Sequence, residues 1–144
     1  MFYKTTATLA AAAMLLSGAA WAETVEVKML NRGEAGTMVF EPAFVQIAPG
    51  DTVKFVPTDK SHNAESMEEM MPEGAEPFKG KINEEIDVTF DVEGLYGVKC
   101  LPHFAMGMVM TIAVGENVEV PADYLEGRLP RNAKKRFEEQ LENL

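Results

Sequence analysis

A ten-residue segment, Lys99–Met108, contains the side chains of this protein that are best suited to bind a transition metal. It holds the only cysteine, Cys100, one of the two histidines, His103, and two methionines. A thiolate, an imidazole and a thioether form a soft, partly uncharged ligand set, which suits copper better than calcium or magnesium. The second histidine, His62, lies in a separate polar segment. We call Lys99–Met108 the ligand loop and interpret it, together with His62, as a candidate metal site.

The ligand types leave several kinds of site open. Two imidazoles and one thiolate in a plane, with a weak and distant thioether, are the ligands of blue-copper sites. The spacing does not choose between Met106 and Met108 as the thioether, because both residues have the same strand parity. Zinc bound by His62, Cys100 and His103 with an open fourth position is the main competitor. A buried cysteine beside two ordinary histidines is the simplest alternative without a metal.

The elements that must position these residues are short strands. Apolar and polar residues alternate, or apolar residues run together, in several segments separated by Gly and Pro turns: 25–30, 38–40, 44–47, 52–56, 86–90, 94–98 and 109–114. Asn31-Arg32-Gly33 is interpreted as turn material. This pattern predicts an all-β protein, a β-sandwich of seven to eight strands. His62 and the ligand loop would emerge at one end of the sandwich if Phe55 and Val98 lie in neighbouring strands.

Helical patterns occur in two places. Residues 67–71 predict a short helical turn capped by Ser66, whose methionines we assign to the core. In the tail, residues 121–126 predict a turn of helix. Beyond them Ala133, Phe137, Leu141 and Leu144 recur at helical intervals and form an apolar stripe. We therefore divide the protein into a sandwich at 23–118 and C-terminal helices at 119–144 that pack on it.

The N-terminus predicts export. Residues 1–22 contain Lys4, an apolar run over 7–16 and a final Ala20-Trp21-Ala22, as in a secretory signal peptide cleaved after Ala22. No later apolar segment is long enough for a membrane anchor, so we expect a soluble periplasmic protein. Cleavage leaves 12 basic and 23 acidic residues, a net charge of −11. This charge makes nucleic acid and anionic membranes improbable partners, and a single cysteine excludes an internal disulfide.

The ligand loop resembles that of the cupredoxin family, and its C-x2-H-x4-M spacing matches plastocyanins and pseudoazurins better than azurins. Further segments are similar to the pseudoazurin group in particular: Phe40-Glu41-Pro42, residues 48–53, His62-Asn63, residues 72–75, residues 96–100 and the helical tail. The resemblance covers essentially everything after the signal. It implies a cupredoxin-like Greek-key β-sandwich with a C-terminal helical extension.

The resemblance also implies a ligand set and an activity. His62, Cys100, His103 and Met108 would bind one copper ion of type 1, which resolves the choice between the methionines. Asn63 would tie the two ligand-bearing segments together by hydrogen bonds. A closed site without a spare base moves one electron between Cu(II) and Cu(I), so the expected protein is an electron carrier and not an enzyme. Leu101 and Phe104 stand where many relatives have threonine and tyrosine, which bears on the reduction potential.

Partners follow from the same resemblance. An apolar patch around His103 would be formed by Met38, Pro57, Pro102 and Met106, and a basic ring around it by Arg32, Lys60, Lys79 and Lys99. Such a surface would steer a monomeric carrier toward acidic redox partners. The expected acceptor is copper nitrite reductase or another denitrification enzyme, and the expected donor a c-type cytochrome. A periplasmic copper chaperone or storage protein, using the methionines as transfer ligands, is the alternative function.

Overall fold

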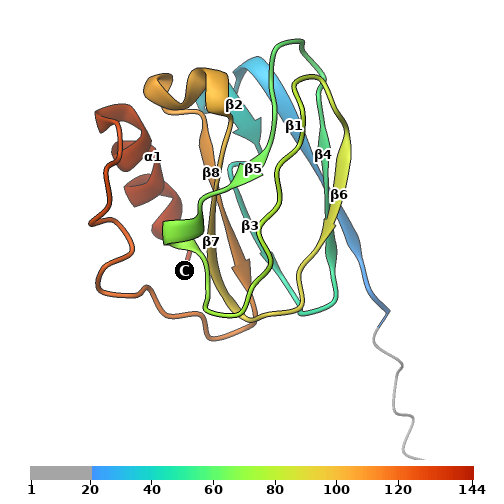
Figure 1. Ribbon diagram of the computed structural model, residues 1–144, viewed down its shortest axis with the longest axis vertical. Coiled ribbons are helices and arrows are strands. Elements are labelled where there is room, and N and C mark those ends of the chain that lie inside the picture. The colour runs from blue at the N-terminus through green and yellow to red at the C-terminus, as the bar shows by residue number, and fades with distance from the viewer. Residues whose placement is uncertain (1–20) are drawn as a thin grey trace, which may run out of the picture.

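The computed structural model describes residues 21–144, which form two four-stranded sheets packed face to face (Figure 1). The predicted signal peptide therefore lies, except for its last two residues, outside the described residues. The strands are β1 (Thr24–Gly33), β2 (Gly36–Glu41), β3 (Phe44–Ile47), β4 (Thr52–Val56), β5 (Glu65–Ser66), β6 (Ile86–Thr89), β7 (Gly94–Lys99) and β8 (Val109–Val114). The helices are the 3₁₀ turns η1 (Glu68–Met70) and η2 (Leu101–Met106) and the α-helix α1 (Arg131–Leu141). The predicted sandwich is confirmed.

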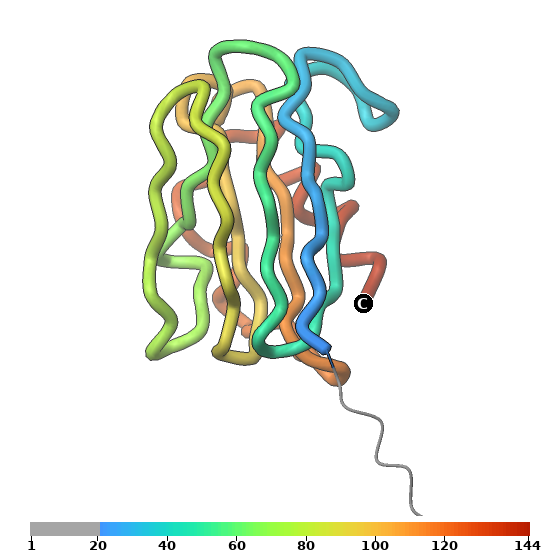
Figure 2. Tube along the Cα trace, turned by 90° about the vertical axis from the view of Figure 1, so that its right-hand side faces the viewer, coloured from blue at the N-terminus to red at the C-terminus, as the bar shows by residue number. Residues whose placement is uncertain are grey.

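The strand order separates β4 from β7. One sheet has the order β2-β1-β4-β6 and the other β3-β8-β7-β5, with β1 parallel to β4 and β3 parallel to β8. The expectation that Phe55 and Val98 lie in neighbouring strands is therefore wrong, because they belong to different sheets. The segments that follow β4 and β7 meet nevertheless, since both strands point to the same end of the sandwich. Figure 2 shows the green segment around residue 60 at that end, beside the blue β1–β2 hairpin.

The core lies between the sheets and follows from the period-two pattern. Val27, Phe55, Val98 and Ile112 are each 0% exposed and point inward from four strands. The ring of Phe55 meets Phe40 edge-on and stacks on Phe78, at centroid distances of 6.2 and 5.8 Å. All six residues of β8 are buried, as its continuous apolar sequence predicts for a central strand covered on both faces.

The helix α1 packs on the outer face of β8 (Figure 1). Ala133 and Phe137 are 0% exposed. They belong to a second apolar cluster, whose buried residues are Met67, Met70, Leu95, Val109, Ala113, Tyr124, Ala133 and Phe137. Leu144 lies beyond the end of the helix and is exposed. Residues 121–126 form hydrogen-bonded turns instead of a helix, so the described tail has one helix. None of the helices in residues 21–144 is long and apolar enough to cross a membrane.

The predicted turn at residues 67–71 is present as η1, but its cap differs. Ser66 belongs to β5, and its hydroxyl is engaged with the backbone of Phe78 at 2.9 and 3.1 Å. Met67, in extended conformation, takes the cap position without a side-chain hydrogen bond. Met67 and Met70 are buried in the second apolar cluster, and Met71 is half-buried and packs against the core between the sheets, which confirms the assignment of these methionines to the core.

Candidate metal centre

Backbone hydrogen bonds within the ligand loop join its two ends. Cys100 N–H donates to Met108 O at 3.0 Å, and Met108 N–H donates to His103 O at 3.1 Å. Between them η2 leads through Pro102 in its first turn and ends at Gly107, whose φ of 91° is the left-handed conformation that glycine adopts most easily. The pairing of β7 with β8 continues directly into this loop. Cys100 and Met108 are thereby held side by side at the end of the sandwich.

Three ligand atoms from the two segments converge on one point. His62 Nδ1 and His103 Nδ1 are 3.1 Å apart, and Cys100 Sγ lies 3.7 and 3.5 Å from them. A circle through the corners of a triangle with these sides has a radius of about 2.0 Å, close to the bond lengths of about 2.0–2.3 Å that nitrogen and sulfur ligands make to a small metal ion. The spacing of the three atoms therefore fits a metal ion without rearrangement.

A hydrogen bond at Nε2, on the side of the ring away from Cys100 and His103, orients His62. Its Nε2 lies 2.8 Å from Asn31 Oδ1, and because an amide oxygen only accepts hydrogen bonds, Nε2 carries the proton. In the neutral imidazole, Nδ1 then presents its lone pair to the centre. Burial and, second, the charge of His103 lower the pKa of His62. Both effects favour the neutral form of the ring, which is the form that binds metals.

Cys100 is 0% exposed, and its surroundings favour the neutral thiol in the absence of a cation. Burial raises the pKa of its thiol, and the backbone N–H groups of Asn63 and His103 offset part of that rise. A metal cation at the centre supplies the positive charge that a buried thiolate requires. A thiol and two imidazole lone pairs that converge on one point form a donor set for a soft or borderline metal.

Asn63 connects the His62 segment to the ligand loop. Its side-chain oxygen accepts the N–H of Leu101 at 2.7 Å, and its amide group donates to Gly80 O and to Glu65, both at 3.1 Å. All the polar atoms of this buried amide are thus satisfied. Glu65 in turn forms an ion pair at 3.6 Å with Lys99, the first residue of the ligand loop. Asn63 is thus connected to the ligand loop both directly, at Leu101, and through Glu65.

The two methionines of the loop point in opposite directions. Met108 is 0% exposed, whereas Met106 is 46% exposed. Only Met108 is therefore on the buried side of the loop with the converging ligand atoms. Parity alone could not separate the two residues, because η2 ends at Met106 and the backbone turns at Gly107.

The residues of the expected docking surface are mostly accessible. Pro102, Arg32, Lys60 and Lys79 are exposed, as is Met106, and Met38 and Pro57 are half-buried. Lys99 differs from the other cations, because it is half-buried, paired with Glu65 and placed 4.9 Å from the centre of the Phe104 ring. Leu101 is 49% exposed and adds apolar area that was not assigned to this surface from the sequence.

Asn31 was not predicted from the sequence as a residue of the site. It was interpreted as turn material, but β1 continues to Gly33 and carries Asn31 to His62, 31 residues further along the sequence. No local pattern marks this residue. Only the parallel pairing of β1 with β4 brings the end of β1 beside the segment that follows β4.

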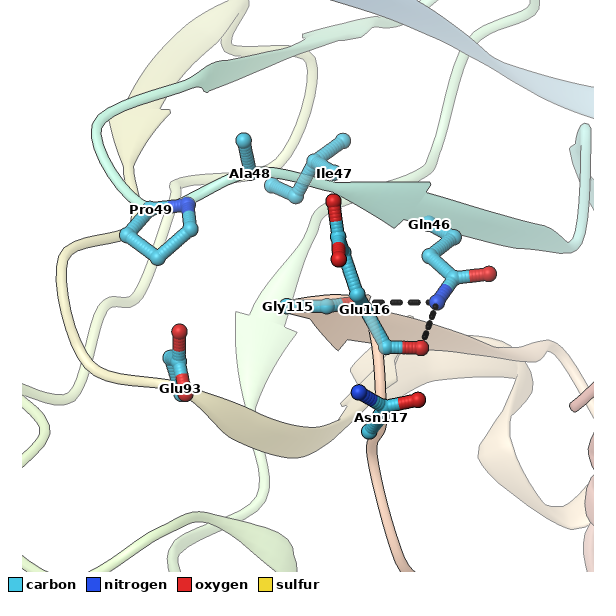
Figure 3. A pocket seen from close by; sticks show the side chains of 8 residues that line it. All are labelled: Gln46, Ile47, Ala48, Pro49, Glu93, Gly115, Glu116 and Asn117. Atoms are coloured by element: carbon cyan, nitrogen blue, oxygen red, sulfur yellow. Dashed lines mark hydrogen bonds between the residues drawn. The ribbon is translucent and has the colours of Figure 1, made fainter.

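The opposite end of the sandwich holds a hollow that is not a metal site. It measures about 540 Å³ and is lined by Gln46, Pro49, Glu93, Glu116 and neighbouring residues (Figure 3). The amide of Gln46 donates to the backbone oxygens of Gly115 and Glu116 at 2.8 and 3.2 Å. Among the described residues, the one cluster of metal-binding side chains is His62, Cys100 and His103, with ligand atoms within 4.8 Å of one another.

Comparison with known proteins agrees with this site. The profile of the family described as copper binding proteins, plastocyanin/azurin family, matches residues 27–115, more than half of the chain. A pseudoazurin of Paracoccus pantotrophus is 50% identical over 98% of this chain and 97% of that protein. A putative pseudoazurin of Rhizobium leguminosarum bv. viciae is 46% identical over 92% of this chain and 88% of that protein.

Solved structures give the same result. The crystal structure of pseudoazurin from Methylobacterium extorquens AM1 superposes with a TM-score of 0.79 at 42% identity, over 83% of this chain and 98% of that one. Native pseudoazurin from Hyphomicrobium denitrificans has a TM-score of 0.76 at 46% identity, over 84% of this chain and 98% of that one.

A β-sandwich with two imidazoles and a thiolate converging at one end defines the class of small copper proteins with a type 1 site. The chain belongs to the plastocyanin/azurin family of copper-binding proteins and, within it, to the pseudoazurins. Its cofactor is one copper ion of type 1. It is an electron-transfer protein and not an enzyme.

Proposed function

We propose that this protein is a periplasmic carrier that passes single electrons to a copper nitrite reductase or another denitrification enzyme, and that His62, Cys100, His103 and Met108 hold its copper. The observation that carries the proposal is the triangle of His62 Nδ1, His103 Nδ1 and Cys100 Sγ, with sides of 3.1, 3.5 and 3.7 Å. The class of acceptor rests on the resemblance to pseudoazurins, which the comparisons strengthen.

Each proposed ligand has its own role. When bound, copper would supply one-electron redox chemistry between Cu(II) and Cu(I). Cys100 would contribute a thiolate, His62 and His103 two neutral imidazoles, and Met108 a weakly binding thioether. The hydrogen bonds of Asn31 to His62 and of Asn63 to Leu101 keep these ligands in place. A site held from outside in this way undergoes little rearrangement when the charge changes.

His103 is the proposed route for the electron. Of the four proposed ligands, His62, Cys100 and Met108 are fully buried, and His103 is half-buried. Its ring is therefore the part of the site that a partner can approach most closely. The exposed apolar side chains of Leu101, Pro102 and Met106 belong to the same loop, and they allow a partner to exclude water near His103.

Charge would orient the carrier. Arg32, Lys60 and Lys79 are exposed cations on a protein with an excess of acidic residues. Positive charge near the copper and negative charge elsewhere would turn the copper end toward an acidic partner. Lys99 contributes less to this steering, because its ion pair with Glu65 already compensates part of its charge.

The chaperone or storage alternative gains no support from the buried methionines of the core. Met29 and Met110 are 0% exposed, and Met67 and Met70 are also buried in the core. Thioethers that are engaged in apolar packing offer no surface path for copper. A buried thiolate with closed coordination also favours retention of the metal over release.

The test is electron transfer from the reduced protein to a copper nitrite reductase, followed by stopped-flow absorption at increasing ionic strength. Lys60→Glu should slow the reaction about tenfold at low salt, with the difference shrinking as salt is added. Arg128→Glu is the matched charge reversal, on an exposed residue of the tail beside η1, and should change the rate little. A rate that is independent of ionic strength, or equal effects of both substitutions, would contradict the docking proposal.

Export and oligomeric state have direct tests. The mass of the protein isolated from periplasm should correspond to a polypeptide that begins at Glu23. Its elution volume in gel filtration should be that of a monomer. A mass that retains residues 1–22 would contradict the cleavage, and a dimeric elution volume would contradict the monomeric carrier.

A further inference from the structure

Arg136, in the second turn of α1, binds backbone oxygens from two distant parts of the sequence. Its Nη1 donates to Met38 O at 2.6 Å and to Gly107 O at 2.9 Å, and its Nη2 donates to Thr37 O at 2.7 Å. No carboxylate in residues 21–144 forms an ion pair with it, since the one salt bridge found there joins Lys99 to Glu65. Arg136 therefore acts as a clamp on the backbone and not as half of an ion pair.

The clamp closes on the residue that precedes Met108. Gly107 also lies directly against the first turn of α1, because a Cβ added to it would come within 3.0 Å of the carbonyl carbon and carbonyl oxygen of Asn132. Helix and loop are thus in contact without intervening side chains. α1 therefore contacts the Gly107 carbonyl, which belongs to the peptide bond that leads into Met108.

The same guanidinium holds the start of β2. Met38 is a non-glycine residue with a positive φ of 52°, a conformation that requires support from its surroundings. The hydrogen bonds of Arg136 to Thr37 and Met38 supply that support. The planar, forked donor set of arginine is required for such a three-way contact, and a lysine ammonium on its flexible stem does not reproduce it.

We propose that Arg136 is a positioning residue for the copper site, which sets the place of Met108 relative to the plane of His62, Cys100 and His103. This inference rests on the ligand set proposed above. A thioether at a weak, distant position has no strong bond to the metal that would hold it, so its place depends on the protein. Arg136 restrains Met108 through its hydrogen bond to the carbonyl of Gly107. Its hydrogen bond to Met38 O connects the copper site to the docking surface.

The decisive variant is Arg136→Lys, which keeps the positive charge but loses the fork. In the copper-loaded protein it should alter the intensity ratio of the two visible thiolate-to-copper absorption bands. It should also change the Cu(I) to Cu(II) ratio at a fixed solution potential about threefold, which is about 28 mV for a one-electron couple. In the metal-free protein, amide exchange at Met108 N–H should become about tenfold faster.

Two controls separate positioning from a general loss of stability. Leu141→Ala removes half-buried apolar packing from the last turn of the same helix and leaves Arg136 in place. It should lower the unfolding temperature without changing the band ratio. Arg131→Lys makes the same substitution at an exposed position of α1 and should change neither property. An unchanged band ratio in Arg136→Lys, or an equal change in Leu141→Ala, would overturn the proposal.

A third variant distinguishes failure of this inference from failure of the ligand assignment. Met108→Gln should change the visible bands strongly if Met108 is a ligand. If the bands respond to Met108→Gln but not to Arg136→Lys, the ligand set stands and the positioning role is wrong. If Met108→Gln leaves the bands unchanged, the ligand assignment itself is wrong and this proposal fails with it.

Discussion

The two ends of the sandwich hold their loops with different chemistry. At the copper end, neutral groups dominate: imidazoles, a thiol and the amides of Asn31 and Asn63. At the opposite end a carboxylate does the equivalent work, because Asp51 accepts the N–H groups of Glu23 and Ala48, both at 2.9 Å. One charged side chain ties a turn to the start of β1 there.

The difference lies in which polar atoms remain without a partner. At the Asp51 end, the protein's own N–H groups satisfy the carboxylate. At the copper end, His62 Nδ1, His103 Nδ1 and Cys100 Sγ face one another, and the hydrogen bond that supports His62 is made by Nε2, on the far side of its ring. Loops that only close a fold satisfy their own polar groups, whereas loops that bind a metal leave lone pairs directed at a shared point.

The largest effect on the copper end should come from removing the thiolate of Cys100. We expect Cys100→Ser to abolish the intense visible absorption of the copper-loaded protein, because the absorbing transition requires the thiolate sulfur. The substitution changes little volume, so the metal-free variant should remain folded, as far-ultraviolet circular dichroism can check. Retention of the intense colour would show that Cys100 is not a ligand and that the two ends do not differ in the way described.

A smaller effect is expected from the support on the far side of His62. Asn31→Leu removes the acceptor that holds the proton on His62 Nε2. Loss of such an outer hydrogen bond typically lowers metal affinity about 10–100-fold, and competition with a copper chelator would measure it. Asn143→Leu, at an exposed site in the tail, serves as the matched substitution. Equal affinities in the two variants would mean that Asn31 does not orient the ligand.

The smallest effect on copper should come from the opposite end. The N–H groups of Glu23 and Ala48 lower the pKa of Asp51, so its carboxylate stabilises the folded state at pH values above the ordinary value of about 3.9. That contribution is lost as pH falls through the lowered pKa. Asp51→Asn should therefore be less stable than the original protein at pH 7, with the difference narrowing in acid.

Denaturant unfolding at several pH values would measure this difference, and the visible spectrum of Asp51→Asn should stay unchanged. Cleavage after Ala22 would turn the Glu23 nitrogen into an ammonium group 2.9 Å from Asp51, which would enlarge the effect in the exported protein. A stability difference that is constant with pH would contradict the proposed role of the Asp51 carboxylate. A shifted copper spectrum would show that the two ends are not independent.

Much of the fold could be predicted because its signals are local. Alternation of side chains identified the strands, and the continuous apolar run of β8 indicated a strand covered on both faces. Capping at Ser66 was wrong, since a distant group competes for its hydroxyl, and helix at residues 121–126 was wrong as well. The Ser66 hydroxyl has a better partner in Phe78, and residues 121–126 close as turns.

The sequence by itself determined the donor types and their close spacing, because Cys100, His103 and Met108 lie within one loop that is closed by hydrogen bonds between its own backbone groups. It also indicated the helix, whose apolar stripe needs only a regular period. The tertiary structure alone decided the rest: that β4 and β7 face each other across the core, that Asn31 reaches His62, and that Arg136 closes on Gly107. These contacts join residues about thirty or more positions apart. No local pattern encodes them, because they exist only once two sheets and a helix have packed.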